Sequence, residues 1–210
     1  MTSTEQLISL RPAGFALLAI SILFMIGAGA AAYFRRFPLP SDPLEQLTLI
    51  ANDRLGWSAQ AIIFPICFVA VAVVFGWMAM QLPAGWPRWL AVAAALASVA
   101  ALLLWLPISA NRLQLAARAA QMIASYDPAA PPEVFRNTGT FWPYTFTALA
   151  GIGLMGAALA LAGVLPTLGW VVAGLAVAGA LLGAFIMHDW PPFMSYVILL
   201  VMAIGLIRSG

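Results

Sequence analysis

The sequence predicts an all-α membrane protein: a polytopic helical bundle with six transmembrane helices, and short amphipathic helices in the loops on one face. Hydrophobic residues make up 64% of the 210 residues and charged residues only 8%, whereas soluble domains carry about a quarter charged residues. Most of six apolar stretches reach the ~17–25 residues that a helix needs to cross a bilayer. They cover residues 13–34, 57–82, 89–105, 141–164, 168–187 and 193–207. We therefore expect residues 1–210 to form a single transmembrane domain.

Each stretch is apolar throughout, without the alternation of a membrane strand, which argues against a β-barrel. The first stretch contains Ala28-Gly29-Ala30, which resembles a signal-peptide cleavage site. Its apolar run continues to Phe34, so we expect a retained helix. The last stretch is the shortest and only marginally long enough for a span.

The two long loops are predicted to be partly helical. Asp42-Pro43-Leu44-Glu45 has the pattern of a helix start, with Asp as the N-cap and Pro in the first turn. The following spacing predicts an amphipathic helix over 42–55 with its apolar face at Leu44, Leu47, Ala51 and Leu55. The third span is predicted to continue as a helix over 111–126, kinked or broken at Pro107. The proline-rich stretch 127–132 then ends it.

Six spans place the connections 34–57, 105–141 and 187–193 on one side of the membrane, which we call the loop face. This face holds six of the seven carboxylates and the only histidine: Asp42, Glu45, Asp53, Asp127, Glu133, Asp189 and His188. It also holds six of the nine arginines: Arg35, Arg36, Arg54, Arg112, Arg118 and Arg136. Binding or chemistry is therefore expected there. The arginine count favours a cytoplasmic loop face, but the opposite connections are much shorter, so the orientation stays open.

The eight tryptophans fall near the ends of the predicted spans, four on each side. Trp57, Trp105, Trp142 and Trp190 belong to the loop face, and the other side has Trp77, Trp86, Trp89 and Trp170. Two such groups are typical of aromatic belts at the two membrane interfaces.

The connection between the last two spans, Met187-His188-Asp189-Trp190-Pro191-Pro192, has two interpretations. Its two prolines favour a structural turn. A carboxylate beside a histidine also favours a general base or a metal ligand, because the carboxylate holds the tautomer of the imidazole. If the protein is an enzyme, the candidate catalytic residues are His188, Asp189, Asp53, Asp127 and Glu133. Such a cluster could hold a divalent cation, although the spacing does not require one and no metal site is predicted.

Aromatic residues are concentrated near the loop face: Tyr33, Phe34, Phe37, Trp57, Trp105, Tyr126, Phe135, Phe141, Trp142, Tyr144, Phe146, Trp190, Phe193 and Tyr196. One interpretation is an interfacial belt with hydrophobic packing of the loops. The other is an aromatic pocket for a flat or long apolar ligand such as a lipid, quinone or pigment. For that pocket the candidate ligand-binding residues are Trp57, Trp105, Tyr126, Trp142, Tyr144, Trp190 and Tyr196.

Several cofactor and ligand classes are excluded by counting residues. One histidine cannot supply bis-histidine haem ligation within this chain, and the single cysteine, Cys67, cannot build a thiolate metal cluster. Any cofactor remains unknown. The net charge of +2 and the lack of a basic run argue against nucleic-acid binding. The spans lack ionisable residues at mid-depth, which disfavours a proton-coupled transporter.

Glycines inside two spans predict close helix packing. The sequence 151–156 matches a dinucleotide-binding glycine pattern, but it lies within a span and not after a strand. Small residues let transmembrane backbones approach each other closely. The predicted helix-packing residues are Gly151, Gly156, Gly179 and Gly183.

Two segments resemble an uncharacterised family of bacterial six-helix integral membrane proteins of unknown function. They are Arg11-Pro12-Ala13-Gly14-Phe15 before the first span, and Leu47 with Ile50-Ala51-Asn52 before the second. The resemblance covers about the first 80 residues and the helix layout. It implies architecture alone, without an activity or site residues.

The leading functional hypothesis is a non-enzymatic integral membrane protein, either an accessory subunit of a membrane complex or a binder of a hydrophobic ligand. An alternative is a membrane-interface enzyme that uses His188 and the loop-face carboxylates on a lipid-like substrate. A small-molecule transporter ranks third. The expected partners are membrane lipids and a protein partner or a second copy of the chain, and the expected location is the bacterial cytoplasmic (inner) membrane.

Overall fold

The structure, a computed structural model, describes residues 9–35, 40–135 and 138–209. Of the residues assigned above to the loop face, Arg36, Phe37 and Arg136 lie outside this part, as does the side chain of Tyr33. Within the described ranges the chain forms seven α-helices and no strand, and six of the helices are long and apolar enough to cross a membrane. The predicted fold class, an all-α bundle with six spans, is confirmed.

The spans follow the predicted order with shifted boundaries. The helices are α1 (Arg11–Ala30), α2 (Pro43–Asn52), α3 (Arg54–Gln81), α4 (Trp86–Ala124), α5 (Phe141–Leu161), α6 (Leu168–Leu182) and α7 (Pro192–Ser209). A 3-10 turn, Ala32–Arg35, follows α1, and a π-helical turn, Gly183–Met187, follows α6. At 18 residues, α7 is about 27 Å long, which nearly matches the ~30 Å hydrocarbon core.

The largest difference from the sequence prediction is that α4 is one continuous helix of 39 residues with Pro107 inside it. Its length of about 58 Å exceeds the hydrocarbon thickness, so its end extends beyond the membrane core. The helix does not break at Pro107 because α3 contacts it on both sides of the proline. Before the proline, Phe64 packs against Trp105, and after it the Trp57 indole N–H donates to the carbonyl of Arg112.

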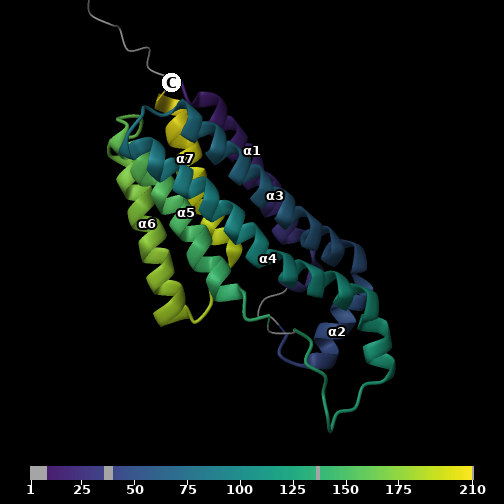
Figure 1. The fold of residues 1–210 in the computed structure, drawn as a ribbon. Helices are drawn as coiled ribbons and strands as arrows, with labels where there is room; N and C mark the ends of the chain where they lie inside the picture. Colours follow the sequence, from purple (N-terminus) through teal and green to yellow (C-terminus); the bar gives the residue numbers. More distant parts are fainter. Residues whose placement is uncertain (1–8, 36–39, 136–137, 210) are drawn as a thin grey trace, which may run out of the picture.

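The six spans pack in a ring in chain order. α3 contacts α1 and α4, α4 contacts α5, α5 contacts α6, and α7 closes the ring against α6 and α1. Figure 1 shows that α3 and α4 reach past the ends of α5 and α6, with α2 beside the extended part of α4. The loop end of the bundle is therefore long on one side and short on the other.

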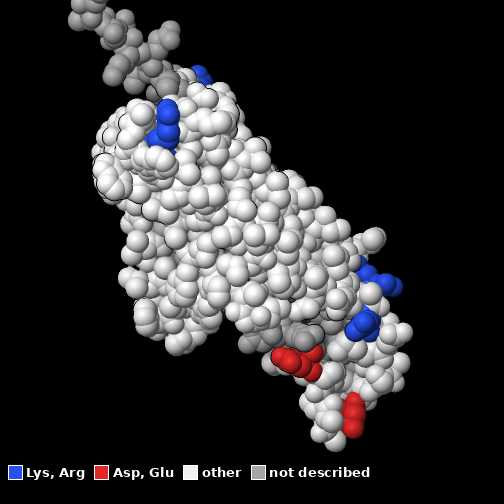
Figure 2. All heavy atoms as spheres, in the orientation of Figure 1, with Lys and Arg blue, Asp and Glu red and all other residues white. Residues whose placement is uncertain are grey.

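Two separate hydrophobic cores follow from this shape. The large core runs through the six spans, with Leu17, Phe75 and Met202 among its fully buried members. The small core lies at the loop end and joins α2, the start of α3 and the extension of α4. We call α2, this extension and the small core the cap. On the face shown in Figure 2, charged side chains lie only near the two ends and leave an uncharged belt between them.

The predicted loop helix is present but shorter than expected. Asp42 caps it by accepting a hydrogen bond from the backbone N–H of Glu45 (3.1 Å), as the sequence pattern indicates. Leu47 is buried against the cap, whereas Leu55 is 87% exposed. The prediction that Leu55 belongs to the same apolar face is wrong, because the chain turns at Asp53 and Leu55 starts α3.

Close packing between α5 and α6 depends on two facing glycines. A methyl group added at Gly156 would lie 2.7 Å from the carbonyl oxygen of Gly169, and one added at Gly169 would lie 2.8 Å from the backbone N of Ala160. Both distances are too short for a carbon atom, and both involve backbone atoms that cannot rotate away. A side chain here therefore forces the two helices apart.

We expect Gly169→Ala to lower the free energy of unfolding of the detergent-solubilised protein by about 1–3 kcal/mol, the usual cost of overpacking, and so to lower its melting temperature. Gly174→Ala in the same helix is the matched control, because nothing lies within 4 Å of the added methyl group. That variant should be neutral or slightly stabilising, since alanine favours a helix over glycine. Thermal unfolding followed by tryptophan fluorescence measures both, and equal midpoints for the two variants would contradict the packing argument.

Candidate functional site

A cavity of about 630 Å³ opens at the loop face. It lies between the extension of α4, the loop that precedes α5 and the turn between α6 and α7. Its lining combines apolar and polar side chains: Phe34, Ile108, Asn111, Arg112, Gln114, Leu115, Arg118, Met122, Glu133, Val134, Phe135, Thr138, Phe141, His188 and Asp189. This size and this mixture are typical of small-molecule binding sites. We call it the loop-face cavity.

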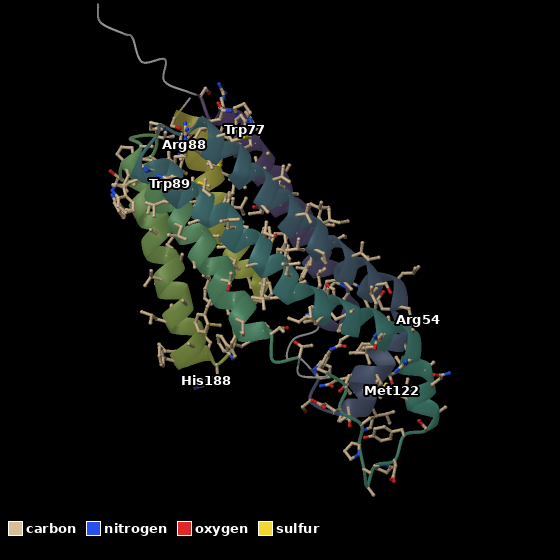
Figure 3. The ribbon with its side chains drawn as sticks, viewed as in Figure 1. Arg54, Trp77, Arg88, Trp89, Met122 and His188 are labelled. Carbon is tan, nitrogen blue, oxygen red and sulfur yellow. The ribbon has the colours of Figure 1, made fainter. Side chains whose placement is uncertain are left out.

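The turn between α6 and α7 brings His188 and Asp189 to one wall of the cavity. The π-helical turn ends at Met187, and His188 follows it with a φ of 51°. This angle lies in the left-handed region, which is uncommon for a residue other than glycine. Figure 3 shows His188 at the loop end of α6, with Met122 on the extension of α4 across from it. The Asp189 carboxylate accepts a hydrogen bond from the backbone N–H of Trp190 (2.7 Å). That bond is local to the turn.

The structure separates the predicted acidic residues into two groups. Glu133 lines the cavity together with His188 and Asp189. Asp127 does not, and its carboxylate accepts from the backbone N–H of Ala129 within the proline-rich loop. Among the residues that the structure describes, no three His, Cys, Asp or Glu side chains are placed to hold a metal ion.

Asp53 also lies away from the cavity and joins the end of α1 to the start of α3. Its carboxylate accepts hydrogen bonds from the backbone N–H groups of Ala32 and Gly56. Arg35 is 4.0 Å from the same carboxylate and donates to the carbonyls of Gly29 and Ala30 at 2.9 Å. These contacts satisfy backbone groups at two helix ends, and Asp53 is not part of the cavity lining.

Arg112 is the residue at this site that the sequence analysis missed. Its guanidinium carbon lies over four aromatic rings, at 5.2 to 5.9 Å from the ring centroids of Trp105, Phe34, Trp57 and Phe64. Each such contact attracts a cation to the negative face of a ring, with an energy of about 0.5–2 kcal/mol. These rings come from α3, α4 and the turn after α1. The side chain is partly buried and lines the loop-face cavity.

A buried amide connects Arg112 to the first span. The Arg112 guanidinium donates to the side-chain oxygen of Gln60 at 2.7 Å, and the Gln60 amide donates to the carbonyl of Ala28 in α1 at 3.2 Å. Gln60 is only 2% exposed. The guanidinium is therefore held beside the last turn of α1.

None of the seven predicted aromatic ligand-binding residues is part of the lining of the loop-face cavity. Trp57 and Trp105 form part of the ring contacts behind Arg112. Tyr126 packs against the small core. Trp142 stacks with Phe146 at the start of α5, with ring centroids 5.6 Å apart. The aromatic residues that do line the cavity are Phe34, Phe135 and Phe141.

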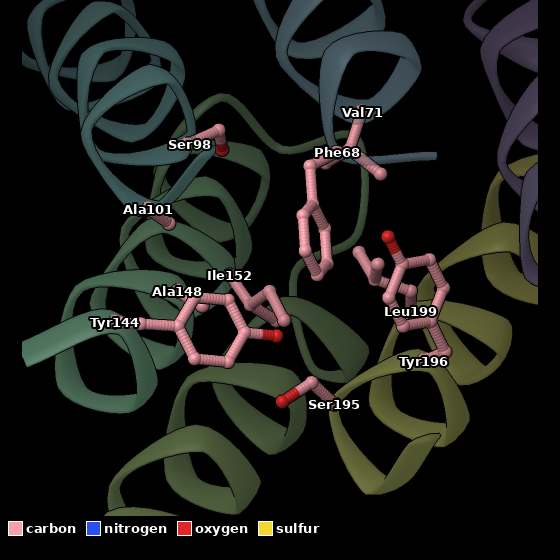
Figure 4. A pocket seen from close by; sticks show the side chains of 10 residues that line it. All are labelled: Phe68, Val71, Ser98, Ala101, Tyr144, Ala148, Ile152, Ser195, Tyr196 and Leu199. Atoms are coloured by element: carbon pink, nitrogen blue, oxygen red, sulfur yellow. The ribbon is translucent and has the colours of Figure 1, made fainter. Parts of the chain in front are cut away.

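Tyr144 and Tyr196 lie deeper, beside a second cavity of only about 30 Å³. Figure 4 shows the hydroxyl groups of Tyr144 and Ser195 turned into this space, with Phe68 between the two tyrosines. The volume is enough for a single water molecule and far too small for a quinone or pigment. These two tyrosines therefore belong to the core of the bundle.

The tryptophans differ between the two ends of the bundle. At the end opposite the loop face, Trp86, Trp89 and Trp170 are 76%, 68% and 53% exposed, and Figure 3 shows Trp89 beside Arg88 at this end. At the loop end, Trp57, Trp105 and Trp190 are at most 5% exposed. Exposed indoles suit a membrane interface, whereas the buried ones pack inside the protein.

The glycines predicted to pack helices have different neighbours. Gly151 faces α4, where an added methyl group would lie 3.2 Å from the carbonyl oxygen of Ala94, and Gly156 faces α6. Gly179 and Gly183 lie under the indole of Trp190, whose N–H donates to the hydroxyl of Ser195 at 2.9 Å. The small residues of α6 thus make room for a tryptophan side chain from the turn before α7.

No family model matches the chain, and no curated protein or solved structure is significantly similar to it. The resemblance of the first 80 residues to a bacterial membrane protein family stays an expectation from the sequence.

We expect Gln60→Leu to destabilise the protein by about 1–3 kcal/mol, because it leaves the Ala28 carbonyl and one Arg112 N–H without their partner. Gln121→Leu is the control, since Gln121 is an exposed amide in the extension of α4, at the same end of the bundle as Gln60. Unfolding in detergent, followed by circular dichroism, compares the two variants. A loss of stability in Gln121→Leu as large as that in Gln60→Leu would show that the buried amide has no special role.

Proposed function

We propose that this protein is a non-enzymatic integral membrane protein that binds a hydrophobic or amphipathic ligand, such as a lipid, quinone or pigment, in the loop-face cavity. The observation that carries this proposal is the cavity itself. Its volume of about 630 Å³ lies within the ~300–1,000 Å³ range of known ligand sites. The protein is expected to reside in the bacterial cytoplasmic membrane.

The cavity favours ligand binding over a purely accessory role in a complex, because packing against a partner subunit needs no internal space. Its apolar side chains, among them Ile108, Leu115 and Phe141, suit a chain or a flat ring. Its polar side chains come from the extension of α4, the loop before α5 and the turn before α7. A ligand with both an apolar body and a polar end fits this mixed lining.

A second candidate function is a membrane-interface enzyme, and one observation favours it. His188 and Asp189, which are neighbours in the turn before α7, line one cavity with Glu133 from the loop before α5. A general base needs a hydrogen-bonded partner that holds its tautomer. Within the described ranges, the hydrogen bond of the Asp189 carboxylate is to the Trp190 backbone and not to His188, which ranks catalysis below binding.

Filling the cavity tests the binding proposal. We expect wild-type protein, extracted gently from its own membrane, to carry a small molecule at fixed stoichiometry in native mass spectrometry. Asn111→Trp places a bulky ring in the cavity and should remove most of that molecule. The control Asn52→Trp adds the same ring at an exposed position outside the cavity and should retain it. A wild-type protein without any bound molecule, or equal retention by both variants, would contradict the proposal.

The enzymatic alternative is tested with the double variant His188→Ala, Asp189→Ala. Wild type and variant are each incubated with the total lipid extract of the source membrane, and the products are followed by mass spectrometry. We expect neither protein to convert a lipid. Conversion by the wild type that disappears in the variant would establish the enzyme in place of the binding protein.

A further inference from the structure

Arg112 lines the loop-face cavity, and its guanidinium has hydrogen-bonding capacity to spare. A guanidinium has five N–H donors, and its hydrogen bond to Gln60 uses one of them. The ion pair that joins two described residues here is that of Arg35 with Asp53, and it does not involve Arg112. Arg112 thus has aromatic faces and an amide around it, but no described carboxylate within 4.0 Å.

The depth of Arg112 makes this arrangement unusual. Through Gln60 it is held at the level of Ala28, two residues before the end of α1. At 20 residues, α1 is about 30 Å long, so its ends lie near the two boundaries of the hydrocarbon core. A charge that is buried from water at this boundary is costly unless it is paired or solvated. Cation–π contacts offset part of that cost.

We propose that Arg112 anchors the oxyanion of an amphiphile, a phosphate or carboxylate that carries an acyl chain. This inference rests on the proposed ligand-binding function and names the chemistry of its ligand. The planar fork of arginine matches the two oxygens of a phosphate or carboxylate. The level of Arg112, beside the last turn of α1, is also where the head group of a membrane lipid meets its chains. The oxyanion would therefore reach the guanidinium while the chain stays in an apolar environment.

The other charges of the cavity limit where an anion can bind. Glu133 and Asp189 are exposed side chains of the lining, as are Arg118 and His188. Among the described lining residues, the two carboxylates offset the two arginines, so their summed charge does not concentrate anions. Recognition then depends on short-range hydrogen bonds at Arg112, which is the less exposed of the two arginines.

The test uses delipidated full-length protein in detergent and four probes with matched acyl chains. Phosphatidylglycerol and phosphatidylethanolamine carry a phosphate, the free fatty acid carries a carboxylate, and diacylglycerol carries neither. Native mass spectrometry titrations give the Kd of each. We expect at least one oxyanion probe to bind about tenfold or more tightly than diacylglycerol, the usual effect of a charged hydrogen bond. The tighter of the phosphate and carboxylate probes identifies the head group.

Three variants assign this preference to Arg112. Arg112→Gln removes the charge, and Gln60→Glu supplies an internal carboxylate at the position of the amide oxygen that Arg112 now contacts. In both variants, the oxyanion probes should bind no more tightly than diacylglycerol. The control Arg54→Gln removes an exposed charge at the same end, outside the cavity lining, and should bind like the wild type. Gln60→Glu keeps all of the arginine contacts to aromatic rings, so it remains informative if Arg112→Gln fails to fold.

Failure of this inference differs from failure of the proposed function. If diacylglycerol binds the wild type as tightly as the oxyanion probes, or if both variants keep the preference, the cavity binds ligands but Arg112 does not select an anion. If none of the four probes binds and no native molecule is retained, both proposals are overturned.

Discussion

The contacts of one guanidinium, that of Arg112, organise the loop end of this bundle. Arg112 lies where the two hydrophobic cores meet, and its contacts reach three spans. Gln60 connects it to the carbonyl of Ala28 in α1. The indole N–H of Trp57 in α3 donates to the backbone carbonyl of Arg112. Because a charge at this depth needs polar or aromatic neighbours, α1, α3 and α4 must all hold their positions around it. Phe34 stacks on Trp57 with the rings nearly parallel, at 4°, and brings the turn after α1 into the same contact.

The cavity follows from the unequal lengths of the spans. α4 continues past Pro107 because α3 supports it on both sides of the proline, and α2 packs on that extension. α5 begins at Phe141 and α6 ends in the turn before His188, so these helices stop short of the cap (Figure 1). The recess between the long and short sides is the loop-face cavity. Its polar residues come from the extension of α4 on the long side, and from the loop before α5 and the turn before α7 on the short side.

The fold was largely predictable, since continuous apolar runs of about 20 residues have one stable solution in a bilayer. The N-cap at Asp42 was equally readable, because it depends on neighbouring residues. Leu55 was misassigned because the turn at Asp53 depends on Ala32, 21 residues earlier. Arg112 was missed for the same kind of reason: its aromatic neighbours come from distant parts of the chain. One signal was available. Gln60 is an amide within an apolar span, and such a residue requires a partner.

At the loop end, tryptophans surround this charge instead of lying at the membrane interface. At the opposite end, exposed indoles are available to the head-group region. At the loop end, Trp57 and Trp105 face Arg112 from inside the protein, so they cannot also anchor the protein in the membrane interface. A lipid oxyanion on Arg112 would provide that anchoring, since it would tie this end of the bundle to the level of the head groups. In that case the bound molecule is both the ligand of the cavity and the element that fixes the depth of the loop end in the bilayer.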